Sequence, residues 1–503
     1  MTTFGFYAVS FLTNAVILVF EITGGRLLAP YLGTSVGVWA GLIAVVLGGM
    51  ALGYHYGGRF GDKNASRERI GLVLFLAGIA AILTWGLRDV LPTWIASEHV
   101  SVVWGAILAG ALLFMPTVIL LAAVSPLLAK NLIQNLSYSS KVVGELNAVG
   151  TAGSIVGALA SGLLLVPLFG VDIILLGVAI LILTLAYLVS QKDAGKRTWV
   201  LIGVLACALL LNTLPTQAGR AVADVSTAYN RIFVTNETYN EEQTLALWTS
   251  SAGIQCQMYV DAEGRVDESR VVEWYLRAHD TAIASFFPRG PEKALFLGGC
   301  VEAFPRYLLG RYPSMNAEVV EIDPGMLEVA KEYFGFVPAS FPTLSSVFED
   351  ARTFVNRNHE PYDVIYMDAF GSAGRVPFQL MTEKMFERLS QNLREDGILL
   401  VNVHGSYEGA GALYPSVYVQ TAKTAFPHVG LYQFTDVPQA PQNLMLVASR
   451  ARELPETITS ETYPDLVLRR AVPDENVITL TDNYAPVEGI FRDKLVRIPS
   501  LLD

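Results

Sequence analysis

Residues that could bind a nucleotide-like ligand follow two successive apolar runs in the second half of the chain. Gly298-Gly299 follows the first run, and Glu321 and Asp323 close the second. A glycine turn after a strand lets a ligand approach the backbone, and an acid after the next strand can accept from ribose hydroxyls. The alternative is an ordinary β-α-β unit in which both acids only cap the strand.

The same pattern continues further along the chain. Asp350 follows a third short run, and Asp368 follows the strongly apolar residues 362–367. Ligands on open, mostly parallel sheets bind at the carboxyl ends of the strands. Four strand ends that each carry a polar candidate are therefore a stronger signal for a ligand site than any one of them.

Alternating strands and helices are expected to position these groups, which predicts an open, mostly parallel α/β sheet that closes with a hairpin. A small β-rich segment precedes it. Expected strands are 231–235, 244–248, 257–260, 294–297, 318–322, 362–367, 398–403, 431–434 and 444–448, and expected helices are 267–287, 303–309, 326–333 and 382–393.

The first half of the chain has a different composition. Only 16% of all residues are charged, and nearly all of the apolar excess lies before Leu214. Apolar runs of roughly 17–28 residues are long enough to cross a bilayer. We predict seven membrane spans, at 4–28, 36–56, 70–90, 100–128, 142–169, 171–189 and 198–214, with a break in the fourth at Pro116 or Pro126.

Charge predicts the orientation of these spans. Three loops, 59–69, 130–141 and 192–197, hold most of the basic residues of this half. The positive-inside rule makes them cytoplasmic, and seven crossings then place the rest of the chain on the extracytoplasmic side. If the short seventh span only lies in the interface, the second half returns to the cytoplasm.

Glu21 lies inside the first span, with Arg26 about one turn further on. A charge in the apolar layer is costly, so such groups tend to be paired or functional. Both a functional role for Glu21 and a structural Glu21–Arg26 pair remain open.

Charge and cysteine content exclude some classes of function. The net charge of −11 argues against nucleic acid, which requires a basic face. No Cys/His spacing typical of a metal site occurs. We expect Cys256 and Cys300 to be two buried free thiols rather than a disulfide, although an external location would permit the bond.

Three motifs in the second half resemble the adenosyl-sulfonium-binding core of spermidine synthases, the polyamine aminopropyltransferases. They are VEIDP at 320–324, EDAR at 349–352 and DVIYMDAF at 363–370. In the first half, FEITGGRLLAPYLGTSVGVWA at 20–40 and GELNAVGTAGSIVGA at 144–158 resemble spermidine-synthase-like proteins fused to a transporter-like membrane domain, as does LTDNYAPVE at 480–488.

The resemblance implies a fold and a division of the chain. About seven transmembrane helices (1–215) would precede a small β-rich segment (222–275) and a Rossmann-like, methyltransferase-type α/β domain (276–503). The protein would be integral to the inner or plasma membrane, in contact with the lipid bilayer, and a homodimer remains open.

The resemblance also implies roles for individual residues. Glu321, with Asp323 beside it, would hold the ribose of the donor, and Asp350 would face its adenine. Gly298 and Gly299 would form the turn under the donor. The donor would be decarboxylated S-adenosylmethionine or S-adenosylmethionine itself, and no metal is required.

The catalytic residues would lie next to the donor. Asp368 would orient and deprotonate an amine acceptor, with Tyr275 and Gln257 (or Gln255) near the substrates. The implied reaction is a displacement in which a neutral amine attacks the methylene carbon beside the sulfonium, and methylthioadenosine leaves.

This chain departs from the family pattern at several positions. The turn reads Gly-Gly-Cys-Val-Glu at 298–302, where Glu302 would repel a donor carboxylate but attract a decarboxylated, cationic donor. Gly371 occupies the place of a second aspartate, and Asp267-Glu268 lies too far before Tyr275 to close over the amine.

We therefore carry several hypotheses. The first is a membrane-bound transferase that moves an aminopropyl group to an amine. The second is a catalytically degenerate domain that acts as an extracytoplasmic binding or scaffold module. A methyltransferase using S-adenosylmethionine is a further alternative, and a transporter with Glu21 on its path is the least favoured.

Overall fold

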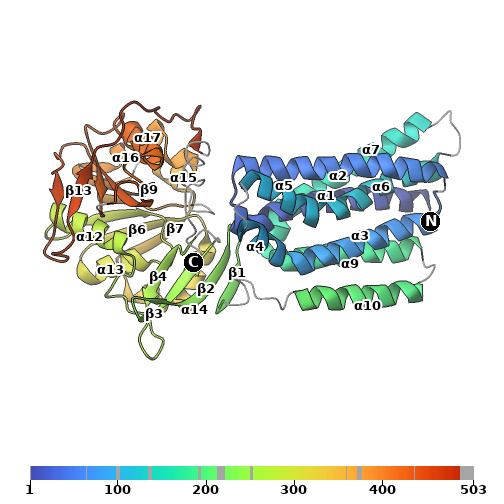
Figure 1. Cartoon of the computed structure of the whole chain (residues 1–503), viewed down its shortest axis with the longest axis horizontal. Coiled ribbons are helices and arrows are strands. Elements are labelled where there is room, and N and C mark those ends of the chain that lie inside the picture. The colour runs from blue at the N-terminus through green and yellow to red at the C-terminus, as the bar shows by residue number, and fades with distance from the viewer. Residues whose placement is uncertain are drawn as a thin grey trace. The chain divides into compact units, whose positions relative to one another are not determined.

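The computed structural model of the chain describes residues 2–63, 65–97, 102–133, 139–190, 194–211, 221–249, 253–357, 359–370, 376–435 and 437–487. These residues form two compact units (Figure 1). The first unit is Met1–Phe233 with Thr249–Gly253, and the second is Val234–Trp248 with Ile254–Asp503.

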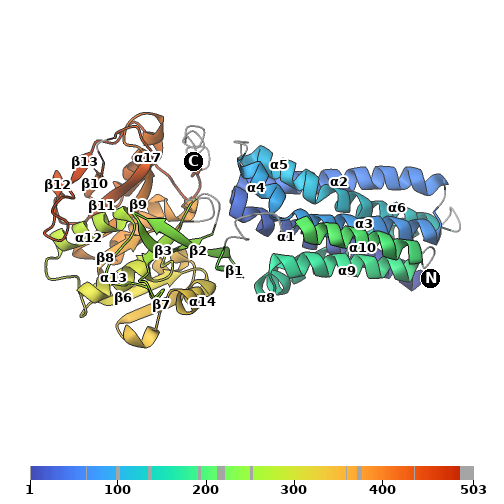
Figure 2. The same cartoon turned by 60° about the horizontal axis from the view of Figure 1, so that its bottom comes forward.

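The first unit is a helical bundle, in which the long helices lie alongside one another (Figure 2). Its helices are α1 (Thr3–Leu32), α2 (Val36–Lys63), α3 (Arg67–Leu87), α4 (Val90–Ser97), α5 (Val102–Leu113), α6 (Met115–Leu132), α7 (Ser139–Ala160), α8 (Val166–Leu168), α9 (Val171–Val189) and α10 (Ala194–Leu211), with a π-helical turn at Ser161–Leu165.

Six helical stretches of the described residues are long and apolar enough to cross a membrane. They are α1, α2, α3, α6, α9 and the stretch from α7 through α8. Large apolar side chains stay exposed on the bundle, including Leu163 (70%) and Leu188 (68%). Lipid would cover this surface, and the protein is an integral membrane protein.

The number of long spans differs from the seven predicted. The fourth predicted span is two helices, α5 and α6, with Phe114 between them and Pro116 in the first turn of α6. This confirms the predicted break at Pro116, because proline fits the first turn of a helix. Pro126 lies inside α6, which continues through it, so no break occurs there. The seventh predicted span corresponds to α10, whose described apolar part, Val200–Leu211, is shorter than the six long stretches. Residues 212–214 of that predicted span lie outside the described residues.

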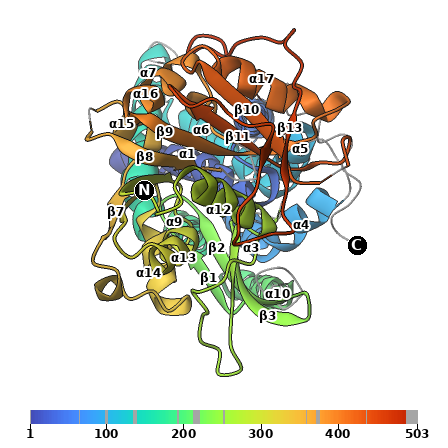
Figure 3. The same cartoon turned by 90° about the vertical axis from the view of Figure 1, so that its left-hand side faces the viewer.

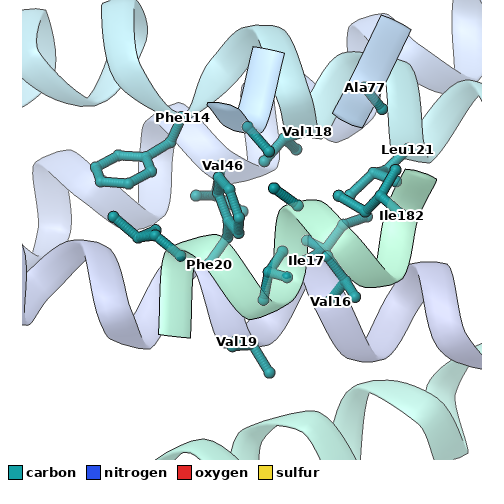
Figure 4. Close-up of a cluster of buried hydrophobic side chains, with 14 of the residues drawn as sticks. Val16, Ile17, Val19, Phe20, Val46, Ala77, Phe114, Val118, Leu121 and Ile182 are labelled. Atoms are coloured by element: carbon teal, nitrogen blue, oxygen red, sulfur yellow. The ribbon is translucent and has the colours of Figure 1, made fainter. Parts of the chain in front are cut away.

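Glycines let helices of the bundle approach closely. A Cβ atom on Gly153 of α7 would lie 2.1 Å from the carbonyl oxygen of Phe11 on α1, and one on Gly157 would lie 2.3 Å from that of Ala15. These glycines therefore allow α7 to pack closely against α1. Elsewhere the core is filled by large side chains, and Phe20 and Phe114 meet edge-to-face at 5.9 Å (Figure 4).

Contacts along α10 give its direction. The guanidinium of Arg197, near the start of α10, lies over the ring of Phe75 on α3. A Cβ on Gly86, near the end of α3, would meet Ala208, near the end of α10. The two helices therefore run in the same direction, and the chain leaves α10 at the end of the bundle where α3 ends.

The same end of the bundle holds the segment that follows α10. Asp89, just beyond α3, accepts a hydrogen bond at 2.5 Å from Arg231, which belongs to the first unit. Arg26 of α1 donates to the backbone carbonyls of Thr227 and Tyr229. Arg26 thus has backbone partners that the predicted Glu21–Arg26 pair did not include.

A small antiparallel sheet follows, in the order β1-β2-β3-β4. Its strands are β1 (Ala223–Ser226), β2 (Arg231–Tyr239), β3 (Glu242–Trp248) and β4 (Cys256–Tyr259). The last three confirm the predicted β-rich segment, and β1 was not predicted.

The large sheet of the second unit has nine strands in the order β12-β13-β10-β11-β9-β8-β5-β6-β7. Figure 3 labels β7, β8, β9, β10, β11 and β13 of this sheet. Strands β9, β8, β5, β6 and β7 are parallel, and β11, β10, β13 and β12 extend the sheet antiparallel. The strands are β5 (Lys293–Leu297), β6 (Asn316–Glu321), β7 (Leu344–Phe348), β8 (Tyr362–Met367), β9 (Leu393–Gly405), β10 (His428–Gln433), β11 (Gln442–Ser449), β12 (Thr457–Ile458) and β13 (Leu468–Ala471).

Helices cover both faces of this sheet. Alternate residues of a strand point to opposite faces, so Leu295 packs with α15, α16 and α17, whereas Phe296 packs with α12 and α13. The helices are α12 (Trp274–Phe286), α13 (Ala303–Arg311), α14 (Pro324–Tyr333), α15 (Ala351–Val355), α16 (Glu383–Gln391) and α17 (Leu413–Ala422). The predicted Rossmann-like sheet is confirmed, and four antiparallel strands extend it where a closing hairpin was predicted.

One predicted helix begins later than expected. The apolar stripe predicted a helix over 267–287, but α12 begins at Trp274. Asp267 accepts from the backbone N–H of Ser269, which favours a turn, and Glu268 pairs with the buried Arg306. These side-chain contacts hold the segment before Glu273 outside the helix.

Candidate active site

The candidate site lies where the sheet order changes direction. Strands β5, β6 and β7 extend to one side of the sheet, while β8 pairs with the other edge of β5. The carboxyl ends of β5 and β8 therefore flank the crevice in which such sheets bind ligands. Gly298 follows β5 and Asp368 follows β8.

Gly298 is required by its surroundings. Its φ of +97° lies in the left-handed region, and a Cβ there would lie 2.5 Å from the carbonyl oxygen of Asp368. The next residue, Gly299, is also tightly enclosed, since a Cβ would lie 2.5 Å from Val319. The turn between β5 and α13 thus has no room for side chains at its first two positions.

Acids follow the next two strands in order. Glu321 accepts hydrogen bonds from the backbone N–H groups of Gly299 (3.2 Å) and Asp323 (3.1 Å), and burial raises its pKa. Asp323 caps α14 by accepting from Gly325, and Asp350 caps α15 by accepting from Thr353 at 2.9 Å. Both aspartates have a structural role, so their contacts with a donor remain predictions.

Three side chains hold the carboxylate of Asp368. Its Oδ2 accepts from the hydroxyl groups of Tyr366 (2.7 Å) and Tyr275 (3.4 Å), and its Oδ1 accepts from the amide of Asn402 (2.9 Å). Burial raises the pKa of Asp368, and these hydrogen bonds to the ionised form oppose that rise. Asn443 in turn donates to the Asn402 oxygen, which fixes the orientation of the amide.

A second carboxylate lies close to Asp368. Glu273 immediately precedes α12, and its Oε1 accepts from the backbone N–H of Gln257 at 2.6 Å. Its Oε2 is buried and has no hydrogen-bond partner. Burial, and to a smaller extent the negative charge of Asp368, raise the pKa of Glu273 to about 8. A buried acid with an unsatisfied oxygen is suited to a cationic or hydrogen-bond-donating ligand.

Three predicted site residues, Tyr275, Gln257 and Asp368, lie in one region. Tyr275 contacts Asp368, and Glu273 accepts from Gln257 and lies close to Asp368. Gln257 is buried on β4, and its side-chain oxygen accepts from Thr244 at 3.3 Å. Gln255 lies before β4 and pairs through its backbone with Leu247. Gln257 is therefore the better placed of the two glutamines.

A disulfide joins the glycine turn to the small sheet. Cys256 of β4 and Cys300 of the turn are bonded, with their Cα atoms 6.5 Å apart. The predicted pair of free thiols is therefore wrong. The two residues lie 44 positions apart, and only the packing of the small sheet beside the turn brings them together.

Glu302 occupies an unusual place at the end of the turn. It has a φ of +59°, is 3% exposed, and accepts from the hydroxyl of Ser346 at 2.8 Å. Burial raises its pKa to about 7, and the charge of Glu321 acts in the same direction. Its side chain thus points toward β7, beneath Gly299, and not toward Asp368.

At two positions the family pattern led us to look for a further acid near the amine. Gly371 lies outside the described residues. Glu268 contributes no carboxylate to the site, because it pairs with Arg306. Arg306 is 1% exposed and also donates to the carbonyl of Phe334.

The late LTDNYAPVE motif packs against the strand ends. Asp482 accepts from Arg352 at 3.0 Å and from Thr382 at 2.5 Å. Arg352 is the arginine of the EDAR motif, two positions after Asp350. The last described part of the chain therefore supports the helix that Asp350 caps.

Sequence reasoning missed three residues of the site, namely Glu273, Tyr366 and Asn402. Tyr366 and Asn402 carried a weak signal, because each is a polar group within a run of apolar strand residues. Glu273 carried none, since it falls inside the stretch that was predicted to be helical. Among the described residues, no group of three or more His, Cys, Asp or Glu side chains could hold a metal ion.

Comparison with known proteins agrees with this geometry. Residues 281–460 match the spermine/spermidine synthase domain. The polyamine aminopropyltransferase of Vibrio vulnificus is 30% identical over 232 residues, which cover 44% of this chain and 76% of that protein. The chain belongs to the spermine/spermidine synthase family. A probable polyamine aminopropyl transferase of Bifidobacterium longum is 30% identical over 236 residues, 42% of this chain and 51% of that protein.

Among solved structures, a probable spermidine synthase from Corynebacterium glutamicum aligns with a TM-score of 0.40 at 17% identity, covering 55% of this chain and 96% of that one. The spermine/spermidine synthase match falls within the second unit. The helices of the first unit lie outside it.

The Glu273 carboxyl gives a pH-dependent stability that can be measured. Its pKa of about 8 in the folded state exceeds the unfolded value of about 4.3, so the stability it contributes is present at low pH and is lost as pH rises toward 8. Glu273→Gln removes this loss. We expect the melting temperature of the variant, relative to the parent, to increase from about pH 5 to about pH 8.

The control for this measurement is Glu360→Gln, because the Glu360 side chain is 92% exposed. Its melting temperature should follow that of the parent at every pH. Parallel curves for Glu273→Gln and the parent would show that Glu273 is not a protonated buried acid.

Proposed function

We propose that this protein is a membrane-bound aminopropyltransferase that uses decarboxylated S-adenosylmethionine as donor and an amine as acceptor. The family uses this donor, and its relatives include polyamine aminopropyltransferases. The observation that carries the proposal is the carboxylate of Asp368, held by three donors beside Gly298 at the point where the sheet order reverses.

The donor end of the site follows the order of the strands. In this proposal Glu321 accepts from the ribose hydroxyls, because it is the last residue of β6 and already contacts the glycine turn. Gly298 and Gly299 leave the backbone open to the donor. Asp350 follows β7, one strand further on, and would face the adenine.

The acceptor end uses the buried acids. The Asp368 carboxylate orients the ammonium form of the acceptor and takes a proton from it. The neutral nitrogen then attacks the methylene carbon, the carbon–sulfur bond breaks, and its electron pair stays on the sulfur of methylthioadenosine. Glu273 would offer its free oxygen to a cationic nitrogen. It would then serve as the second acid of the site, because this chain has Gly371 at the sequence position of the expected aspartate.

A turnover assay tests the proposal. Full-length protein in detergent is incubated with decarboxylated S-adenosylmethionine and 1,4-diaminobutane, and release of methylthioadenosine is measured, together with calorimetry of methylthioadenosine binding. We expect both binding and release. Binding without release would favour the scaffold alternative, and release of S-adenosylhomocysteine from S-adenosylmethionine would favour methyl transfer. Neither binding nor release would refute the proposal.

We also propose that the second unit lies on the extracytoplasmic side. Basic residues near the end of α2 (Arg59), at the start of α3 (Arg67 and Arg69) and near the start of α10 (Arg197) lie at one end of the bundle. The chain leaves α10 at the opposite end, where Arg231 bonds to Asp89. The disulfide supports the same side, because disulfides persist mainly in oxidising compartments.

Reporter fusions after Asp503 check this side of the membrane. We expect an alkaline phosphatase fusion to be active and a green fluorescent protein fusion to be dark in a bacterial host. A matched pair of fusions after Ser66, in a basic loop, should give the reverse pattern. An active fluorescent fusion after Asp503 would place the unit in the cytoplasm, and would mean that α10 does not cross.

A further inference from the structure

We propose that the Cys256–Cys300 disulfide positions the donor-binding turn, so that the donor site is complete only in the oxidised protein. This inference rests on the proposed function, since it concerns the same site. Neither cysteine contacts the reacting atoms in this scheme, and both act through the residues beside them.

The bond joins two residues whose neighbours in the sequence donate hydrogen bonds to acids of the site. Cys256 immediately precedes Gln257, whose backbone N–H holds Glu273 at 2.6 Å. Cys300 immediately follows Gly298-Gly299, and Gly299 donates to Glu321 at 3.2 Å. One covalent link therefore connects the Glu273 side of the site to the Glu321 side.

The turn needs such a link because its own backbone is unfavourable. Cys300 has a φ of +48° and Glu302 a φ of +59°, in a region where residues other than glycine are uncommon. A chain with glycine at these positions would adopt the turn freely. Because neither residue is glycine, contacts with the surrounding structure must hold both in this conformation, and the disulfide is such a contact for Cys300.

One other contact between β4 and the element that follows the turn is a weak hydrogen bond. Arg306 of α13 approaches the sulfur of Met258 at 3.8 Å. The bond also crosses between two sheets, because Cys256 belongs to the four-stranded sheet and the turn follows β5 of the nine-stranded sheet. Breaking the bond should therefore let β4 and the turn move apart while each sheet remains intact.

The redox step is simple thiol chemistry. Reduction breaks the Sγ–Sγ bond with two electrons and two protons, and leaves a thiol on each cysteine. A phosphine reductant supplies the electrons and becomes a phosphine oxide with oxygen from water. Reoxidation by a small disulfide reverses the step through thiol–disulfide exchange, and the oxidant leaves as two thiols. Cys300 is only half-buried, so a small reagent can reach the bond.

Two measurements on the full-length protein test the inference. Calorimetry gives the Kd of methylthioadenosine before and after reduction, and we expect binding to weaken about tenfold when the turn is released. Hydrogen exchange follows the amide of Glu302, which donates to the Gly299 carbonyl at 2.8 Å in the turn. We expect this amide to exchange faster in the reduced protein, and reoxidation should restore both values.

Variants separate the bond from other effects of the reductant. Cys256→Ser should behave like the reduced parent and should not respond to the phosphine. Cys207→Ser is the matched control, since Cys207 is a free, exposed cysteine of α10, and it should keep the full redox response.

The outcomes distinguish this inference from the proposed function. If the oxidised parent fails to bind methylthioadenosine, the proposed function fails, while hydrogen exchange still decides whether the bond positions the turn. If exchange at Glu302 is the same in both redox states, the inference is overturned. An unchanged Kd with intact binding in the oxidised parent also overturns it.

Discussion

Replacing Asp368 with asparagine is expected to lower turnover by roughly two to four orders of magnitude, which is the usual contribution of a general base. Asparagine keeps the size of the side chain and can still accept from Tyr366 and Tyr275. It cannot take a proton from an ammonium or attract one by charge. Affinity for methylthioadenosine should change by less than about threefold, because the donor is held mainly by residues of the other strands.

The control for this variant is Asp396→Asn. It makes the same change of carboxylate to amide in a side chain that is 66% exposed and pairs with Arg452. Turnover should be unaffected by it. If Asp368→Asn retained parental turnover while its melting temperature also matched the parent, Asp368 would not be the base, and Glu273 would be the remaining buried acid beside the site.

Gly298→Ala is expected to remove donor binding almost completely. The new Cβ would lie 2.5 Å from the carbonyl oxygen of Asp368, and the φ of +97° is itself unfavourable for alanine. The turn must therefore move away from β8, which separates the turn from the carboxylate of Asp368, the proposed base. We expect methylthioadenosine to bind at least about a hundredfold more weakly, and the unfolding free energy to fall by about 1–3 kcal/mol.

Gly310→Ala is a matched control with the opposite expected sign. Gly310 lies in α13, and no atom lies within 4 Å of a Cβ built on it. Alanine is favoured over glycine inside a helix, so this variant should be as stable as the parent or more stable by up to about 1 kcal/mol. Parental binding by Gly298→Ala would show that the turn does not form the donor site.

The sequence determined most of the fold, because the signals it carries are local. Apolar runs give membrane spans and buried strands by length alone, and β8 was predicted with its observed bounds, Tyr362–Met367. The predicted hairpin appears as β10 and β11. Glycines and acids after successive strands also predicted where the candidate site lies, since strand ends of a parallel sheet share one edge.

The sequence was less reliable where a long-range contact competes with a local preference. The apolar stripe extends before Trp274, but the pairing of Glu268 with Arg306 draws the chain away from the helix.

Only the tertiary structure decided the chemistry around Asp368. Nothing in the spacing of residues 273, 366, 368 and 402 shows that they share one buried region, since they come from the residue before α12, from β8, from the residue after β8 and from β9. Cys256 and Cys300 likewise become partners only because two separate sheets pack together. Burial then sets the protonation of Glu273, and burial is a property of the packed chain that no local pattern encodes.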